Sequence, residues 1–110
     1  MALSFAVPSI DLSGDVLVRR TGAFSKQRMR LQDVQRVVAV SRDAITHEET
    51  IVVFQAAGTV EFWISEFDQN FNGVMNQLKS VLPGFLGLED FVAPEPFEPI
   101  EKVLWARTGL

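Results

Sequence analysis

The stretch at residues 50–85, TIVVFQAAGTVEFWISEFDQNFNGVMNQLKSVLPGF, decides the fold of this chain. Its pattern predicts two strands joined by a tight turn, followed by one amphipathic helix over residues 70–82. Asp68 and Asn70 are both suitable N-cap residues, because their side-chain oxygens can accept from the unpaired amides of the first turn. Pro83 and Gly84 then end the helix. Apolar residues at helical spacing form one stripe: Phe71, Val74, Met75, Leu78, Val81 and Leu82.

A two-residue turn at Ala57 and Gly58 would set the register of the two strands, with Val53 facing Phe62. One face of this ribbon, which we assign to the core beneath the helix, then carries Ile51, Val53, Val60, Phe62 and Ile64. The opposite face carries Val52, Phe54, Glu61 and Trp63. A shift of one residue would exchange the two faces. In either register both faces hold large apolar groups, so the second face also requires a cover.

The second face is a candidate interface. An aromatic side chain flanked by aliphatic ones is typical of interface hot spots, which makes Val52, Phe54 and Trp63 the predicted partner-binding residues. The partner would be another protein or a second copy of this chain. The alternative is that the tail of the same chain covers this face through Phe91, Phe97 or Trp105.

Length and composition indicate one soluble globular domain. The chain has 110 residues, of which 47% are hydrophobic and 22% charged, and it contains no cysteine. These values predict a single domain over residues 1–110, with a core at 13–85 and a docked arm and last strand at 86–110. No apolar run is long enough to span a membrane, and the N-terminal residues lack the basic and apolar segments of a signal peptide. We therefore expect a cytoplasmic protein without disulfides, cofactors or a metal site.

The net charge of −4 conceals an asymmetry along the chain. Residues 1–42 hold seven of the ten Lys and Arg residues, whereas residues 43–110 hold eleven of the fourteen acids. Nucleic-acid binding requires a dominant positive face, so an acidic chain is a poor candidate for it. A local basic patch remains as a second candidate site, and it comprises Arg19, Arg20, Lys26, Arg28 and Arg30.

Further strands are expected at residues 3–7, 15–20, 24–31, 33–41 and 100–107. If residues 24–31 are extended, Lys26, Arg28 and Arg30 lie on one side of the strand. A helix over residues 30–36 is an alternative, because Leu31 and Val34 also fit a period of 3.6. Residues 42–49 are charged and predict a loop. Residues 87–99 hold three prolines and four acids, which predicts an extended arm docked by Phe91, Val92 and Phe97.

Several short strands, a hairpin and one closing helix that ends in Leu-Pro-Gly resemble the pleckstrin-homology-like fold. The segment FWISEFDQNFNGVMNQLKSVLPG at residues 62–84 is similar to small bacterial domains of that superfamily, in which an aromatic strand runs through an acidic, glycine-containing turn into the helix. The resemblance covers about residues 13–85. It implies an α+β fold, with a bent antiparallel sheet or partly open barrel closed by the helix. The chain departs from the pattern in having five or six expected strands before the helix, where seven are usual, and an extension after it.

The resemblance also implies a binding scaffold more often than an enzyme, although a fold alone assigns no function. In pleckstrin-like proteins, basic residues near the first two strands hold anionic head groups, and the cluster from Arg19 to Arg30 would lie near that place. The alternative is a solvated strand face, paired with the acidic arm of the same molecule. A small, acidic, cysteine-free chain without a site also has the composition of many bacterial toxin-neutralising immunity proteins.

Catalytic or metal-binding motifs are weak. His47 precedes two glutamates, but it has no second histidine at zinc-binding spacing, and adjacency in a loop does not make a catalytic dyad. The acids between Glu89 and Glu101 do not follow the spacing of a calcium loop. We therefore predict a non-catalytic protein-binding module with an immunity or adaptor role. Recognition of an anionic ligand or a membrane surface by the basic cluster is the alternative, and an enzyme using His47 is the third reading.

Overall fold

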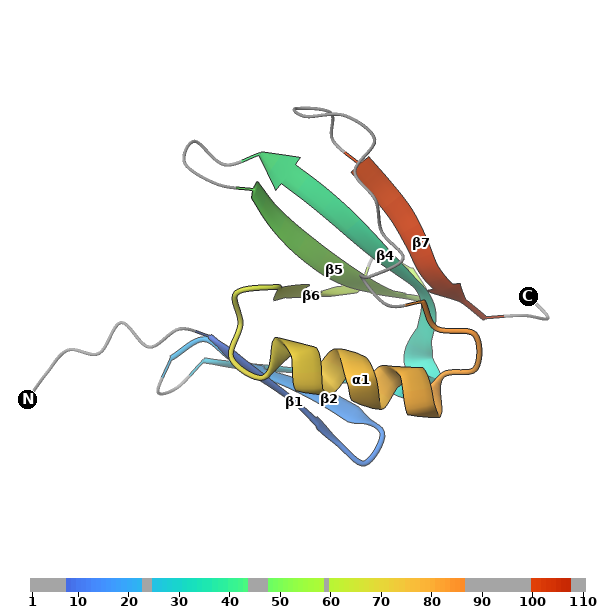
Figure 1. Ribbon diagram of the computed structural model, residues 1–110. Helices are drawn as coiled ribbons and strands as arrows, with labels where there is room; N and C mark the ends of the chain where they lie inside the picture. Colours follow the sequence, from blue (N-terminus) through green and yellow to red (C-terminus); the bar gives the residue numbers. More distant parts are fainter. Residues whose placement is uncertain (1–7, 23–24, 44–47, 59, 87–99, 108–110) are drawn as a thin grey trace, which may run out of the picture.

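The computed structural model describes residues 8–22, 25–43, 48–58, 60–86 and 100–107. Within these residues, seven strands, one α-helix and a short 3-10 helix follow one another (Figure 1). They are β1 (Ser9–Ser13), β2 (Val16–Arg20), β3 (Lys26–Arg30), η1 (Leu31–Asp33), β4 (Val34–Asp43), β5 (Glu48–Ala56), β6 (Glu61–Ser65), α1 (Phe71–Val81) and β7 (Ile100–Ala106). The predicted α+β class is confirmed. Among these residues the strands form two separate antiparallel sheets and no closed barrel.

The first sheet is a meander in the order β1-β2-β3. The predictions at residues 15–20 and 24–31 correspond to β2 and β3, whereas β1 was not predicted. Pro8 precedes this strand: its carbonyl accepts from the amide of Gln69 at 2.8 Å, and Ile10 donates to the carbonyl of Gln69 at 3.0 Å. These bonds tie β1 to the segment that leads into α1. The strand predicted at residues 3–7 lies outside the described residues.

The second sheet has the order β6-β5-β4-β7. Its two central strands are rich in Val and Ile, the residue types that favour a pleated, buried surface. The last strand of the chain pairs antiparallel with β4, so Arg36 lies opposite Ala106 and Ser41 opposite Ile100. Strands were expected at both places, and both are present. The alternative helix at residues 30–36 is wrong except for the single turn of η1.

The hairpin formed by β5 and β6 has a different register from the predicted one. Val53 faces Trp63 and Phe54 faces Phe62, and the amide of Ala56 donates to the carbonyl of Val60 at 2.9 Å. Three residues, not two, therefore connect the strands, and Gly58 takes a positive φ of 78° there. Hairpin loops of three residues commonly place a glycine in this left-handed conformation. The extra residue exchanges the two faces of β5.

The helix is confirmed, with differences at both ends. Asn70 occupies the N-cap position in a left-handed conformation but forms no side-chain cap bond. Its amide nitrogen instead donates to the carbonyl of Ile10 and to Asp11, each at 3.1 Å. Val81, which we assigned to the apolar stripe, is about half exposed. Beyond Pro83, the chain turns away at Gly84, which has a φ of 81°.

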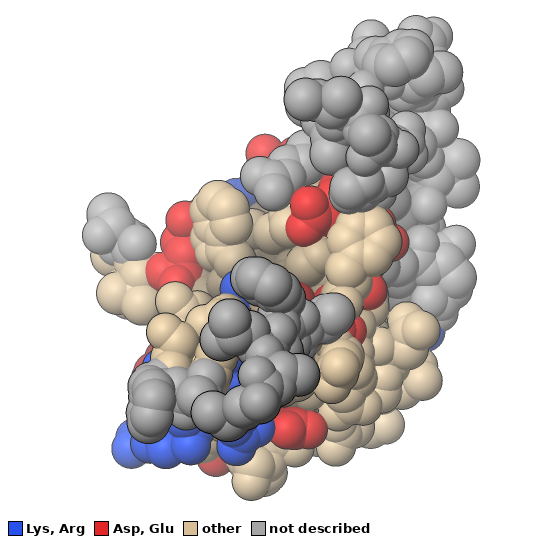
Figure 2. Space-filling model, turned by 90° about the vertical axis from the view of Figure 1, so that its left-hand side faces the viewer, with Lys and Arg blue, Asp and Glu red and all other residues tan. Residues whose placement is uncertain are grey.

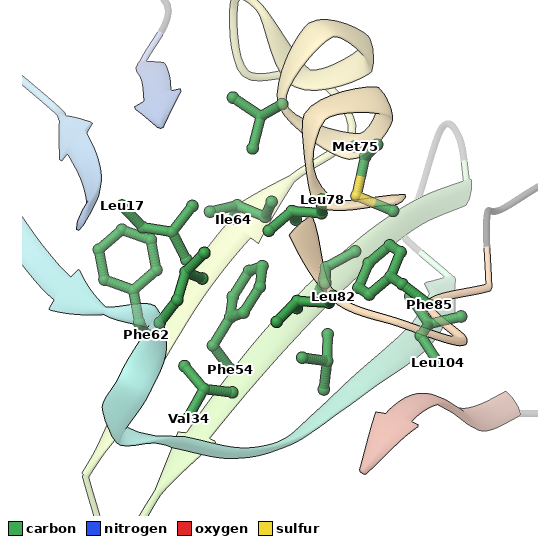
Figure 3. Close-up of a cluster of buried hydrophobic side chains, with 14 of the residues drawn as sticks. Leu17, Val34, Phe54, Phe62, Ile64, Met75, Leu78, Leu82, Phe85 and Leu104 are labelled. Carbon is green, nitrogen blue, oxygen red and sulfur yellow. The ribbon is translucent and has the colours of Figure 1, made fainter. Parts of the chain in front are cut away.

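One hydrophobic core joins both sheets to the helix (Figure 3). Leu17 comes from the first sheet, Phe54 and Phe62 come from the second, and Leu78 comes from α1. The two phenylalanine rings meet edge to face, with their centroids 6.1 Å apart. Phe85 and Leu104 extend the core beyond the helix to β7. Because α1 lies across the first sheet and beside the second (Figure 1), one stripe of the helix covers both.

Candidate functional site

The predicted basic residues lie on the β1-β2-β3 sheet, and the strand register determines which face each one occupies. Directly opposed residues of an antiparallel pair project to the same face. On one face of the sheet the register gives three opposed pairs: Arg20 and Lys26, Val18 and Arg28, and Val16 and Arg30. Four of the five predicted cations therefore share a face. The alternation in residues 24–31 predicted this for Lys26, Arg28 and Arg30, and the strand register adds Arg20.

A hollow of about 900 Å³ lies against this face and extends to the turn between β5 and β6. All four cations line it, and Asp33 is the one carboxylate among its described lining residues. The apolar part of the lining includes Val16, Val18 and Val60. Figure 2 shows Lys and Arg side chains gathered along the lower edge of the molecule, over this sheet. The hollow is thus positively charged at its rim and partly apolar, a combination suited to an anionic ligand that also carries apolar groups.

Most of these cations have no competing partner within the described part of the chain. Arg20 donates to Asp11 at 3.2 Å, and both side chains are about half exposed. Lys26, Arg28 and Arg30 are exposed, and in the described residues no ion pair or side-chain hydrogen bond engages them. Exposed pairs such as the one at Arg20 contribute only about 0–1 kcal/mol. An incoming anion would therefore displace little.

Arg19 does not belong to this site. It lies opposite Ile10 and Gln27, on the face of β2 that the hollow does not touch. Its Nε donates to Oδ2 of Asp68 at 2.8 Å and its Nη2 donates to Oδ1 at 3.1 Å. The same carboxylate accepts from the amide of Ser65 at 3.0 Å. Arg19 is therefore a structural residue that holds β2 to the turn before α1, and its inclusion in the basic cluster was wrong.

The predicted partner-binding face does not form. Val52 and Phe54 are completely buried in the core, because the three-residue loop turns them inward together with Phe62. Trp63 points to the other side of the sheet and is 48% exposed. Trp63 is thus accessible as predicted, but Val52 and Phe54 are separated from it by the thickness of the sheet and cannot share a contact surface with it. Trp105, proposed as a cover, packs against the core and donates to the carbonyl of Pro83 at 3.1 Å.

Trp63 borders a smaller depression of about 300 Å³ on the outer face of the second sheet. Its apolar lining comprises Val38, Val40, Ile51, Val53 and Trp63. Glu61 and Glu101 stand at its edge; Glu61 accepts from the indole nitrogen of Trp63 at 3.3 Å, and Glu101 is paired with Arg36 at 3.1 Å. This depression is a second candidate site, smaller than the basic hollow.

Sequence reasoning missed one contributor to the basic hollow. Val60 was assigned to the core, but it is 58% exposed and lines the hollow from the β5–β6 turn. Val60 lies just before the first residue of β6, Glu61, at the end of the hairpin, where few neighbours cover it. The signal in the sequence was its position next to Ala57 and Gly58, the residues expected to form the turn.

The remaining candidates lie outside the described residues. This applies to His47, to the acids between residues 87 and 99, and to the arm predicted to dock through Phe91, Val92 and Phe97. Within the residues that are described, no group of three or more His, Asp or Glu side chains could hold a metal ion. In the same residues, no helix has the length and apolar character required to cross a membrane.

Comparison with known proteins identifies no relative: no family model, no curated protein and no solved structure matches this chain. The functional argument therefore depends on the geometry of the two candidate sites.

Proposed function

We propose that this protein is a non-catalytic binding module that recognises an anionic ligand through the basic hollow. The observation that carries the proposal is the arrangement of Arg20, Lys26, Arg28 and Arg30 along one concave surface, with a single described carboxylate among them. A surface of one charge sign attracts ligands of the opposite sign and strengthens their binding at low ionic strength. Guanidinium groups also form paired hydrogen bonds to carboxylates and phosphates.

A pleckstrin-homology-like scaffold is part of this proposal. It is supported by short antiparallel strands that are followed by one helix closing a shared core, and by basic residues on the second and third strands. The chain differs from that pattern because β7 follows the helix and joins the sheet beside β4. Such a scaffold is compatible with ligand binding, a role that requires no catalytic group.

The test is binding to anionic probes at increasing salt. We expect fluorescence-detected binding of a labelled glutamate-rich peptide or of inositol hexakisphosphate to weaken as salt rises from 50 to 500 mM, because screening shortens the range of exposed charges. The charge reversal Arg28→Glu should weaken binding at least about tenfold, which corresponds to losing one charge-assisted hydrogen bond.

Lys79→Glu is the matched control, because it makes the same change in net charge on an exposed position of α1, away from the hollow. Equal losses in the two variants would show that only overall charge matters. Absence of binding to every anionic probe would refute the proposal.

A second candidate function is protein binding at the depression beside Trp63. It is favoured by the half-exposed indole, since Trp is enriched among residues that dominate interface energies. We expect Trp63→Ala to remain folded and to lose a partner that co-purifies with the wild-type chain. Retention of that partner by the folded variant would exclude this surface.

A further inference from the structure

The backbone at the edge of the β1-β2-β3 sheet gives a second indication of what the hollow binds. β3 is the outer strand of the order β1-β2-β3, so one of its sides has no neighbouring strand in the described sheet. The amide of Thr21 donates to the carbonyl of Ser25, and the amide of Leu31 donates to the carbonyl of Asp15. Both pairs belong to the register that links β2 and β3.

These two bonds determine which way the backbone of β3 points. In an antiparallel ladder, hydrogen-bonded pairs alternate with non-bonded pairs. Because the backbone groups of residues 25 and 31 bond to β2, the N–H and C=O groups of Gln27 and Met29 between them also point toward β2. Lys26 and Arg28 therefore direct both their N–H and their C=O groups toward the open edge. The same residues direct their side chains into the hollow.

We propose that the ligand of the basic hollow is an extended acidic peptide that pairs with β3 as a fourth strand. This inference rests on the proposed function and names the class of ligand. Strand addition uses main-chain hydrogen bonds for affinity and alternate side chains for specificity. Lys26 and Arg28 offer both, because each combines a cationic side chain with an N–H and a C=O group that no strand of the described sheet occupies.

The spacing of the cations specifies the sequence of the peptide. Residues two apart on a strand are about 7 Å apart, and a paired strand has the same spacing. Residues directly opposite Lys26, Arg28 and Arg30 would project to the same face as these cations. Acidic residues at every second position would therefore meet the three cations in register. Val60, exposed on the far wall of the hollow, can contact apolar parts of the same peptide.

A phosphate-bearing ligand agrees less well with the geometry. It would use the cations but leave the backbone groups of Lys26 and Arg28 unmatched, and a compact head group needs cations that converge on one point. Here the cations are spread along a strand. The row of charges has one competing explanation, since charged residues on edge strands discourage unwanted pairing between molecules. The experiment below separates these readings.

The probe is the labelled heptapeptide TEVEVET, blocked at both ends, measured by fluorescence anisotropy against the full-length protein. Two versions carry N-methyl groups, one on the three glutamates and one on the two valines, so that the charges are equal. In an antiparallel pairing, which is the arrangement we propose, the glutamate amides donate to β3 and the valine amides point away. Methylation of the glutamates should weaken binding at least about tenfold, and methylation of the valines should leave it unchanged.

Matched variants of β3 test the protein side. Arg28→Gln and Gln27→Glu each lower the net charge by one, but Gln27 lies on the opposite face of the strand. We expect Arg28→Gln to weaken peptide binding several-fold and Gln27→Glu to have little effect. Circular dichroism checks that both variants are folded.

The outcomes distinguish this inference from the proposed function. If all three peptides bind equally, strand pairing is wrong and anion recognition stands. If the peptides do not bind but inositol hexakisphosphate or phosphatidylserine vesicles do, the ligand carries phosphate, and the inference is again overturned. If no anionic probe binds, both proposals fail, and the cations are explained by their effect in discouraging unwanted pairing at an edge strand.

Discussion

Removing the carboxylate of Asp68 should be the most damaging single change to a polar residue in the described structure. Its side chain is 2% exposed, and the Arg19 side chain that it binds is 20% exposed. Three hydrogen bonds reach its two oxygens, two from Arg19 and one from the amide of Ser65. Asp68→Ala would leave a largely buried guanidinium and a buried amide without partners. Breaking such a pair costs about 3–5 kcal/mol of unfolding free energy.

A double-mutant cycle tests the origin of this loss. Arg19→Ala alone should cost a similar amount, because it leaves the carboxylate buried and unpaired. The double variant should be destabilised by about as much as either single variant, which gives a coupling energy equal to one single loss, about 3–5 kcal/mol. Urea unfolding followed by far-UV circular dichroism measures all four free energies. If Asp68→Ala does not fold, Asp68→Asn keeps one acceptor and should lose about 1.5–3 kcal/mol.

The control is the pair formed by Arg36 and Glu101, with side chains that are 45% and 61% exposed. Its N–O distance of 3.1 Å is close to the distances at Asp68, but solvent screens it, so Glu101→Ala should cost less than about 1 kcal/mol. A loss of similar size at both sites, or additive effects at Arg19 and Asp68, would refute the argument from burial.

Three further changes test the fold. Phe54→Ala should lower the free energy of unfolding by about 3–5 kcal/mol and Trp63→Ala by less than about 1 kcal/mol. Chemical denaturation that gives losses of similar size would support the two-residue turn, which places both side chains on one face. Gly58→Ala should lower the free energy of unfolding by about 1–2 kcal/mol, because φ is 78° at this position. Gly22→Ala should be nearly neutral in the same chemical denaturation, because the added Cβ would meet no atom within 4 Å. Gly73→Ala should not give the usual helical gain of about 1 kcal/mol, because the new Cβ would contact Oδ1 of Asn70. Thermal melts should show that gain only in an Asn70→Gly background, and a gain in the wild-type background would contradict the contact.

The kinds of element were predictable from the sequence, because hydrophobic periodicity reports directly on which face of a strand or helix is buried. The helix, the valine-rich strands β4 and β5 and the last strand all have strong patterns of this kind. β1 has one too, since Ile10 and Leu12 alternate with Asp11, but Pro8 was interpreted as ending a strand when it precedes one. Proline is acceptable before the first residue of a strand.

The register of the β5–β6 hairpin was not predictable, because both faces of β5 are apolar. A pattern such as IVVF fits either face, and the choice depends on one residue of loop length. This single ambiguity misplaced Val52, Val53 and Phe54 together.

The candidate site was predictable in part. Alternation along β3 correctly grouped Lys26, Arg28 and Arg30 on one side. The same rule, applied to β2, would have separated Arg19 from Arg20, because neighbours on a strand point to opposite faces. The partner of Arg19 was not predictable, since Asp68 lies 49 residues away in sequence and appeared to be a helix cap. The hollow itself depends on the tertiary approach of β3 to the β5–β6 turn, which no local pattern reports.

The position of β7 has a consequence for biosynthesis. β4 becomes a central strand only when residues 100–106 pair with it, and these emerge from the ribosome after every other described element. Until then the nascent chain has an open edge along VQRVVAVSRD, where the valine-rich centre of the strand can pair with the same edge of another chain. Pairing across about 60 to 70 residues of sequence is also slow, because loop closure precedes the contacts that reward it. A chain released before Ile100 would thus be prone to aggregation, because it has its helix but lacks both β7 and the core residue Leu104.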